Sequence, residues 1–300
     1  MAAIQSVIAT INGQTYTLNY NSSTDSYEAS ITAPTVTSYN QTGHYYPITV
    51  TATDVAGNSA TINDKHSTFG TNLQLRVKET VKPVITLNSI GTGAILTTNA
   101  PLVEFTVTDT GAGVNKDSVV LKIDNKTMSL GTPTAVTNGF KFSYSASGLS
   151  DGAHTIIIDA SDNDGNAAQT FTRSFTIDTV PPTLNITAPT DNLATNANSV
   201  TVTGATNDAT SSPVTVAISV NGVDAGTVTV GANGAFSKTV TLQSGENRIV
   251  ITATDAAGKS TTITRNVLFD TSAPEFSSVT VAPNPVNTGA TYTITVKLKS

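Results

Sequence analysis

The chain has 300 residues, of which 38% are hydrophobic and 12% charged, with a net charge of −6 and no cysteine. The lack of cysteine excludes disulfides, thiolate zinc sites and a cysteine nucleophile. Nucleic acid and membrane insertion are not expected, because Lys and Arg are not clustered and no apolar stretch approaches the length of a bilayer span. Frequent Thr, Val, Asn and Ser predict an all-β fold.

The N-terminal residues 1–6 have no basic region, apolar core or cleavage site, so no signal peptide is predicted. We expect either export by another route, such as cell lysis, or a sequence taken from a longer protein. Residues 6–11 and the following Asn12-Gly13 predict a strand and a hairpin turn. They align with residues 217–222, which predict the third strand, C, of a sandwich. The first module is therefore expected to lack strands A and B.

One pattern occurs three times, at residues 44–58, 154–166 and 247–259. Each copy is a strand with alternating apolar residues that ends in a turn containing Asp, and the period is about one hundred residues, which is typical of an immunoglobulin-like (Ig-like) domain. A second strand and a proline-containing hinge follow each copy, so the pattern predicts the last two strands, F and G, of a sandwich. We predict tandem Ig-like β-sandwich modules with these boundaries: 1–80 without strands A and B, 81–180, 181–272, and 273–300 as a strand A–B segment.

The hairpin at residues 216–222 and the run from residue 251 to residue 274 resemble the bacterial Ig-like repeats of surface adhesins. Similar modules occur in secreted glycosidases and in the tail proteins of phages and prophages. The resemblance covers the whole chain and implies an extracellular or virion location. Its motifs specify the fold strongly and the function weakly, because this fold has many unrelated roles.

The last segment predicts a strand pair with one apolar face. A lone two-stranded hairpin is marginally stable in water, and an uncovered sheet edge favours strand addition. Two interpretations remain open: these strands complete the first module of another copy, head to tail, or the sequence was cut from a longer array. The residues expected on the assembly strands are Val279, Val281, Tyr292, Ile294, Val296 and Leu298.

The turn after the second copy of the pattern is a candidate calcium site. Asp162, Asp164 and Asn166 offer the oxygen ligands that calcium prefers, and Asp178 at the next hinge would add another. Turn aspartates near module junctions bind calcium in some Ig-like adhesins, so the resemblance also implies this site. The alternative is a plain turn in which these side chains cap backbone amides. No cofactor is required, and calcium is the one candidate.

Six of the eight tyrosines lie in the first module. Tyr39, Tyr45 and Tyr46 lie among Asn, Ser and Gly residues, a composition typical of recognition surfaces. They are a candidate surface for a ligand such as a cell-surface glycan. The alternative is that they face the core of the module.

No catalytic pattern is present, so an enzyme is not expected. The histidines have no metal-binding spacing, and His154 aligns with Tyr46 at the start of strand F, where an aromatic residue often bonds back to the chain. The sequence predicts a non-enzymatic structural protein of a phage-tail-like virion or surface appendage, which assembles with itself or with other virion or surface proteins by strand complementation. The alternative is an extracellular adhesin or carbohydrate-binding spacer stabilised by calcium.

Overall fold

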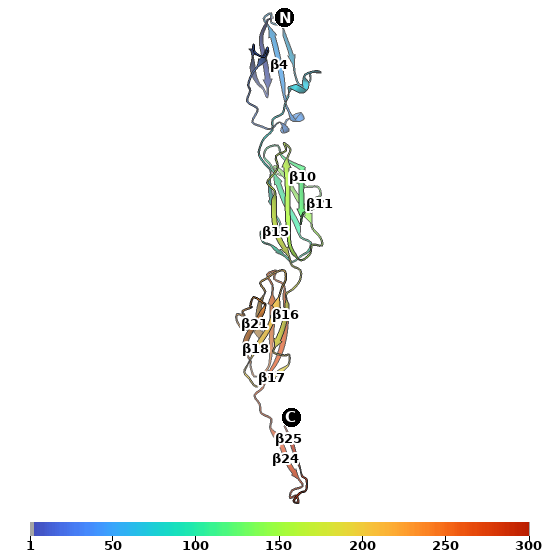
Figure 1. The fold of residues 1–300 in the computed structure, drawn as a ribbon, viewed down its shortest axis with the longest axis vertical. Coiled ribbons are helices and arrows are strands. Elements are labelled where there is room, and N and C mark those ends of the chain that lie inside the picture. The colour runs from blue at the N-terminus through green and yellow to red at the C-terminus, as the bar shows by residue number, and fades with distance from the viewer. Residues whose placement is uncertain (1–2, 300) are drawn as a thin grey trace. The chain divides into compact units, whose positions relative to one another are not determined.

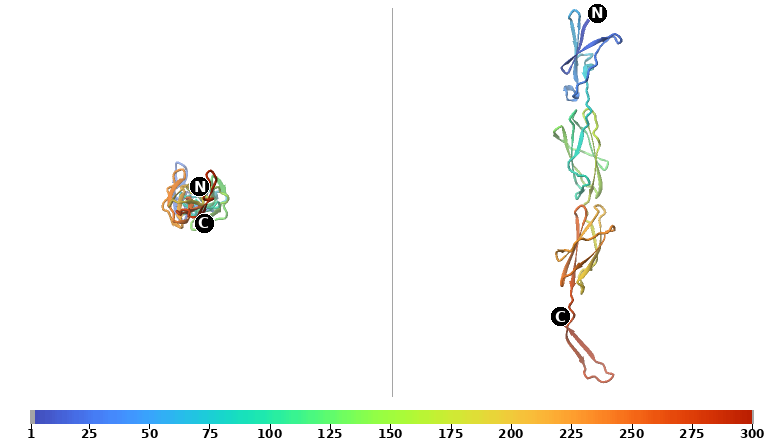
Figure 2. Two further views of the ribbon diagram at one scale, coloured as in Figure 1. Left: turned by 90° about the horizontal axis from the view of Figure 1, so that it is seen from below. Right: turned by 90° about the vertical axis from the view of Figure 1, so that its left-hand side faces the viewer.

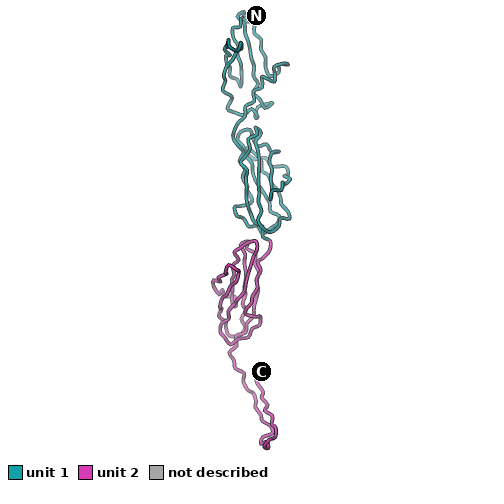
Figure 3. Tube along the Cα trace, viewed as in Figure 1, with its two compact units in different colours: residues 1–178 teal, residues 179–300 magenta. Residues whose placement is uncertain are grey.

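The computed structural model describes residues 3–299, which belong to two compact units, residues 1–178 and residues 179–300 (Figure 3). Within the described residues, the regular elements are β-strands and three short 3-10 helices. Unit 1 contains two modules and unit 2 contains one module followed by a hairpin (Figure 1). The chain is therefore all-β, with tandem Ig-like modules.

Module 1 is built around one sheet with the strand order β3-β2-β1-β4-β5, and β6 pairs with the start of β4. Asn12 and Gly13 both have positive φ, at 46° and 74°, which is the conformation that a two-residue β1–β2 hairpin requires. The elements are β1 (Ile4–Ile11), β2 (Gln14–Asn21), β3 (Ser26–Glu28), η1 (Ser38–Asn40), η2 (Thr42–His44), β4 (Tyr46–Asp54), β5 (Ser59–Ile62), η3 (Gly70–Leu73) and β6 (Gln74–Leu75).

Module 2 is a sandwich of two sheets, with the orders β11-β10-β14-β15-β8 and β12-β13-β9-β7. Alternate residues of β9 and β14 face the space between the sheets, so Phe105, Ile156 and Ile158 are fully buried. The strands are β7 (Val84–Leu87), β8 (Ile95–Leu96), β9 (Leu102–Thr108), β10 (Val114–Ile123), β11 (Lys126–Met128), β12 (Thr134–Val136), β13 (Gly139–Ser145), β14 (Gly152–Asp162) and β15 (Phe171–Ile177).

Module 3, in unit 2, repeats this plan with sheets β16-β18-β21 and β17-β23-β22-β19-β20, which face each other as two layers (Figure 2). Val202, Ile218 and Ile251 are fully buried between them. The strands are β16 (Thr183–Ala188), β17 (Leu193–Thr195), β18 (Ser199–Asn207), β19 (Thr215–Val220), β20 (Val223–Asp224), β21 (Ala235–Thr241), β22 (Gly245–Thr254) and β23 (Ser260–Phe269).

The hairpin of unit 2 consists of β24 (Phe276–Ala282) and β25 (Thr293–Leu298). Among the described residues these two strands pair only with each other. Every residue from 271 to 299 is exposed. The hairpin therefore carries its backbone ladder but contributes to no core within this chain.

Candidate metal centre

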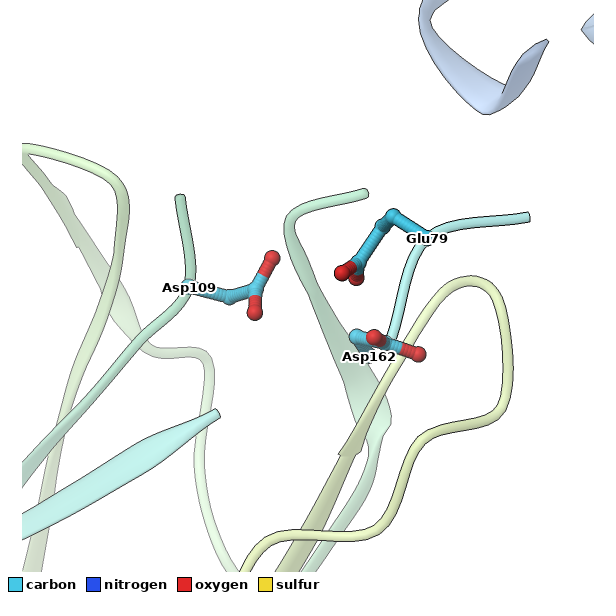
Figure 4. A group of neighbouring side chains, drawn as sticks. All are labelled: Glu79, Asp109 and Asp162. Atoms are coloured by element: carbon cyan, nitrogen blue, oxygen red, sulfur yellow. The ribbon is translucent and has the colours of Figure 1, made fainter. Parts of the chain in front are cut away.

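Three carboxylates from separate segments of unit 1 meet at one end of the module 2 sandwich (Figure 4). Asp162 is the last residue of β14, and Asp109 follows β9 in the opposite sheet. Glu79 lies in the segment between β6 of module 1 and β7 of module 2. Because each strand ends at the same edge of the sandwich, the fold places the two aspartates together and the connecting segment adds the glutamate.

The three side chains bring one oxygen each within 4.8 Å of one another. Asp109 and Asp162 are buried, with 5% and 1% of their surface exposed, and Glu79 is half-buried. None of the three belongs to a salt bridge within the described residues. The site therefore concentrates negative charge where water is scarce and where no protein cation balances it.

Asp109 has one satisfied oxygen and one that lacks a partner. Its Oδ1 accepts hydrogen bonds from the backbone N–H groups of Gly111 (2.9 Å) and Gly113 (2.8 Å). Its Oδ2 is buried without any hydrogen-bond partner in the described structure, and the Asp109 and Glu79 carboxylates are turned toward each other (Figure 4). Leaving a buried acceptor unsatisfied costs about 1–3 kcal/mol, so this atom is suited to bind a cation.

Asp162 is held in place by the turn that follows it. Its Oδ1 accepts from the backbone N–H of Asn166 and its Oδ2 from the Asn166 side-chain amide, both at 2.7 Å. That amide also donates to the backbone oxygen of Glu79 at 3.0 Å. Asn166 therefore orients the two acids by donating hydrogen bonds, and its amide nitrogen faces the carboxylates.

The carboxylates influence each other's protonation. Burial raises the pKa of Glu79, and its interaction with the Asp162 side chain raises that pKa further. Burial also opposes ionisation of Asp162, but hydrogen bonds from Asn166 and Glu79 outweigh it, so the pKa of Asp162 lies below its usual value. Adjacent buried carboxylates resist simultaneous ionisation, so Glu79 binds a proton more readily than Asp162 does.

The donor set fits calcium. All three groups offer hard carboxylate oxygens, and Ca²⁺ takes such ligands at about 2.3–2.6 Å. Two oxygens around one calcium ion are then at most about 5 Å apart, which accommodates the 4.8 Å limit within which these atoms lie. A cation held here would also satisfy the free Oδ2 of Asp109.

Of the four expected calcium ligands, only Asp162 belongs to this group. The Asp164 carboxylate points to module 1, where its Oδ2 accepts from the Thr37 hydroxyl (2.5 Å) and the Glu79 backbone N–H (3.1 Å). Asp178 follows β15, whose end pairs with the start of β14, so it lies a full strand length away from Asp162. That separation is about 30 Å, so the expectation that Asp178 shares an ion with Asp162 is wrong.

Further hydrogen bonds join module 1 to this end of module 2. The Lys78 ammonium donates to the backbone oxygen of Asp164 at 2.9 Å, and the Asn40 side-chain amide donates to the backbone oxygen of Gly111 at 3.1 Å. The Asn163 amide ties the turn to the loop after β9 through the carbonyl of Gly113, at 2.9 Å. The carboxylate group therefore lies where two modules of unit 1 meet.

Module 3 contains an equivalent pair of acids. Asp208 follows β18 and Asp255 follows β22, and their oxygens come within 4.8 Å of one another. Asp208 Oδ1 accepts from the backbone N–H of Ser211 at 2.7 Å, while Asp255 Oδ2 is buried without a hydrogen-bond partner in the described structure. The Asp109–Asp162 arrangement is therefore a recurring feature of these modules. Aligning the residues that follow β9 and β18 would have identified it in the sequence.

The candidate tyrosine surface is occupied by contacts within module 1. Tyr46 is buried and its hydroxyl donates to the Val36 carbonyl at 3.0 Å. Contrary to the expected ligand surface, Tyr46 is therefore not accessible to a ligand. Tyr45 is half-buried and donates to Asp64 at 2.8 Å. Tyr39, also half-buried, stacks on His44 with ring centroids 4.3 Å apart.

The residues expected on the assembly strands all lie on the exposed hairpin. Tyr292 directly precedes β25, and the others lie on β24 or β25. All six residues are exposed: Val279, Val281, Tyr292, Ile294, Val296 and Leu298.

Two facing sheets, antiparallel except for the β8–β15 and β17–β23 pairs, define modules 2 and 3 as Ig-like sandwiches. Residues 82–179 match the sequence model of a family described as bacterial Ig-like domain. Residues 182–271 match a second model, glucodextranase, domain B. Of the tandem Ig-like modules of this chain, one therefore matches bacterial Ig-like domains and the next matches glucodextranase domain B.

Among curated proteins, bacillopeptidase F of Bacillus subtilis (strain 168) is 32% identical over an alignment 180 residues long, and the match covers 56% of this chain and 12% of that protein. The match therefore spans a small part of the relative. Fibronectin(III)-like modules of Clostridium thermocellum CbhA align with a TM-score of 0.38 and 17% identity, over 62% of this chain and 94% of theirs. A bacterial ice-binding adhesin of 1.5 MDa aligns with a TM-score of 0.34 and 23% identity, over 90% and 88% of the two chains.

Within the described part of the chain, no helix has the length and apolar character needed to cross a membrane.

Proposed function

We propose that this chain is a non-catalytic spacer segment of an extracellular bacterial surface protein of the adhesin type, in which calcium stabilises the junction between modules. The observation that carries the proposal is the buried, partnerless Oδ2 of Asp109 beside Glu79 and Asp162. The match of residues 82–179 to bacterial Ig-like domains supports the surface location.

Calcium at this site would act on the connection between modules. Glu79 belongs to the connecting segment, whereas Asp109 follows β9 and Asp162 ends β14 in module 2. An ion that binds all three fixes the segment to the sandwich and removes the repulsion among the acids. A ligand that binds only the folded state at one hundred times its Kd stabilises that state by about 2.7 kcal/mol. A spacer gains a stiffer junction from such an ion.

The structural role in a phage-tail-like virion is the second candidate, and it depends on assembly of copies. We infer that module 1 corresponds to strands C to G of a sandwich and that β24–β25 corresponds to an A–B pair. The sheet β2-β1-β4-β5 has the same order as β11-β10-β14-β15 in module 2, which supports the first correspondence. The antiparallel pairing of β24 with β25 resembles that of β7 with β9, which supports the second.

Thermal unfolding in calcium and in chelator tests the calcium proposal. We expect calcium at about 1 mM to raise the unfolding temperature of the wild-type protein by several degrees, since 1 kcal/mol corresponds to about 4–8 °C in a domain of this size. Asp109→Asn keeps the acceptor that binds Gly111 and Gly113 but removes the charge, so it should abolish the calcium response. In chelator, the variant should be at least as stable as the wild-type protein, because repulsion is relieved.

Asp117→Asn is the matched control, because the Asp117 side chain is 81% exposed and contacts only the neighbouring Lys116 among charged groups. It should retain the full calcium response. Equal unfolding temperatures of the wild-type protein in calcium and in chelator would contradict the calcium proposal.

A further inference from the structure

The inward face of β4 in module 1 is less covered than the same face in the other modules. Ile48, Val50 and Ala52 are half-buried. They occupy the β4 positions that pair with Ile11, Ala9 and Val7 of β1. The matching residues of module 2 and module 3 are buried in full or nearly so: Ile156, Ile158 and Ala160, and Ile249, Ile251 and Ala253.

A groove lies on this face. Its volume is about 530 Å³, and it is bordered on the sheet side by Ile11, Ile48 and Tyr16. Ile31 and Pro34, from the segment after β3, form the other side. In module 2 the residues equivalent to Ile11 and Ile48 pack in the core that includes Val103, Phe105 and Val107 of β9. The groove is therefore on the side of the sheet where another module carries its A–B strand pair.

The hairpin β24–β25 has the apolar face that such a position requires. Val281 is directly opposite Ile294, and Val279 is opposite Val296. Directly opposed residues lie on the same face of an antiparallel pair, so these four form one continuous apolar strip. Ile294 is 58% exposed, whereas the residues that face inward on β9 and β18, such as Val103 and Val202, are fully buried.

The chain itself shows how such a pair covers the face. In module 2, β7 pairs antiparallel with β9, and in module 3, β16 pairs antiparallel with β18. Each pair belongs to the sheet that packs against the other sheet of its module, the one that contains β10, β14 and β15 in module 2 and β19, β22 and β23 in module 3. The two segments also carry net charges of opposite sign: residues 273–300 contain two lysines and one glutamate, a net charge of +1, while residues 1–80 contain five acidic and three basic residues, a net charge of −2.

From these observations we infer that the hairpin β24–β25 of one copy of this chain docks on the half-covered inward face of β4 in module 1 of a second copy. The strip of Val279, Val281, Ile294 and Val296 enters the groove and covers Ile48 and Val50. The two surfaces differ, so the contact is heterologous and repeats head to tail. It goes beyond the calcium proposal and does not depend on it.

Sedimentation of the intact chain in chelator separates this inference from the calcium proposal. We expect the wild-type protein to form concentration-dependent oligomers, and Ile294→Asp to shift it to monomer by at least a tenfold loss of affinity. Thr295→Asp introduces the same charge on the opposite face of β25 and should still assemble. Because the hairpin is fully exposed, neither variant disturbs a module core, and unchanged thermal unfolding of the modules verifies this.

Cross-linking locates the contact, and the native chain contains no cysteine that would interfere. A Thr35→Cys variant carries its thiol at the groove. It is mixed with a Val281→Cys variant and a short bifunctional thiol reagent. The expected product is a dimer of the two variants, at a yield several times that from mixing Thr227→Cys, on module 3, with Val281→Cys. Wild-type protein that stays monomeric at high concentration, assembly that survives Ile294→Asp, or equal yields from both mixtures would overturn the inference.

Discussion

At the scale of single residues, Asp109 shows how a backbone turn can present a charge. Gly111 and Gly113 hold its Oδ1 through their N–H groups, and this fixes Oδ2 toward the other acids. Gly113 has a φ of 77°, which a side chain would disfavour. The loop after β9 therefore positions one oxygen for a cation by binding the other.

Gly111 also makes room for Glu79, and this gives a test that leaves every ligand in place. A Cβ at Gly111 would lie 2.5 Å from the carboxyl carbon of Glu79. Gly111→Ala should displace that carboxylate and weaken calcium binding about tenfold or more, which is about 1.4 kcal/mol, as measured by calorimetric titration.

Gly131→Ala provides the control, since a Cβ at Gly131 meets no atom within 4 Å. Its calcium affinity should equal that of the wild-type protein. If both variants bind calcium equally well, Glu79 is not a ligand.

His154 gives module 2 a dependence on pH. It is buried, with ring nitrogens 2.7 Å from the Asp124 carboxylate and 2.7 Å from the Ser150 carbonyl. Burial lowers the pKa of His154, but these two interactions outweigh it, so that pKa lies above its usual value. The protonated ring is therefore favoured in the folded state.

A raised folded-state pKa stabilises the protein fully below the unfolded-state pKa of about 6.5. We expect the free energy of unfolding of module 2 to fall as the pH rises through the folded-state pKa of His154, as measured by urea unfolding at several pH values. His154→Gln should remove this decrease. A wild-type protein whose stability is constant from pH 6 to pH 9 would contradict the prediction.

At the scale of elements, the alternation of apolar residues and the residue types of tight turns predict most of the strands and hairpins. Alternating apolar residues in β14 and β22 predict strands with one buried face, and Asn12-Gly13 predicts the β1–β2 hairpin because both positions need positive φ. The short strands β8 and β17 are harder to predict, because each pairs in parallel with a strand far along the chain. Two-residue and three-residue strands carry too little pattern to reveal such pairing.

The metal centre was only partly predictable for a similar reason. Asp162 stands out because it begins a repeated turn, but Glu79 and Asp109 reach it from segments 83 and 53 residues away. Asp164 and Asn166 follow the spacing of calcium ligands, yet they serve as a contact to Thr37 and as a hydrogen-bond donor. Spacing along a turn does not determine which side of the turn each side chain faces.

At the scale of the whole molecule, two features act at different places: the carboxylates of unit 1 and the hairpin of unit 2. The acids of unit 1 lie where module 1 meets module 2, and an ion there would stabilise that junction. The hairpin of unit 2 carries an uncovered apolar strip, and its partner surface lies in module 1 of a second copy. A surface spacer needs the first feature, and a head-to-tail assembly needs the second.

Anomalous X-ray scattering from crystals grown with calcium would show whether Glu79, Asp109 and Asp162 hold a calcium ion. We expect one anomalous peak in unit 1 at about 2.3–2.6 Å from an oxygen of each of the three carboxylates, Oδ2 of Asp109 included. A crystal that shows no peak among these three side chains, or a peak bound only by the turn at Asp164, would contradict the calcium proposal.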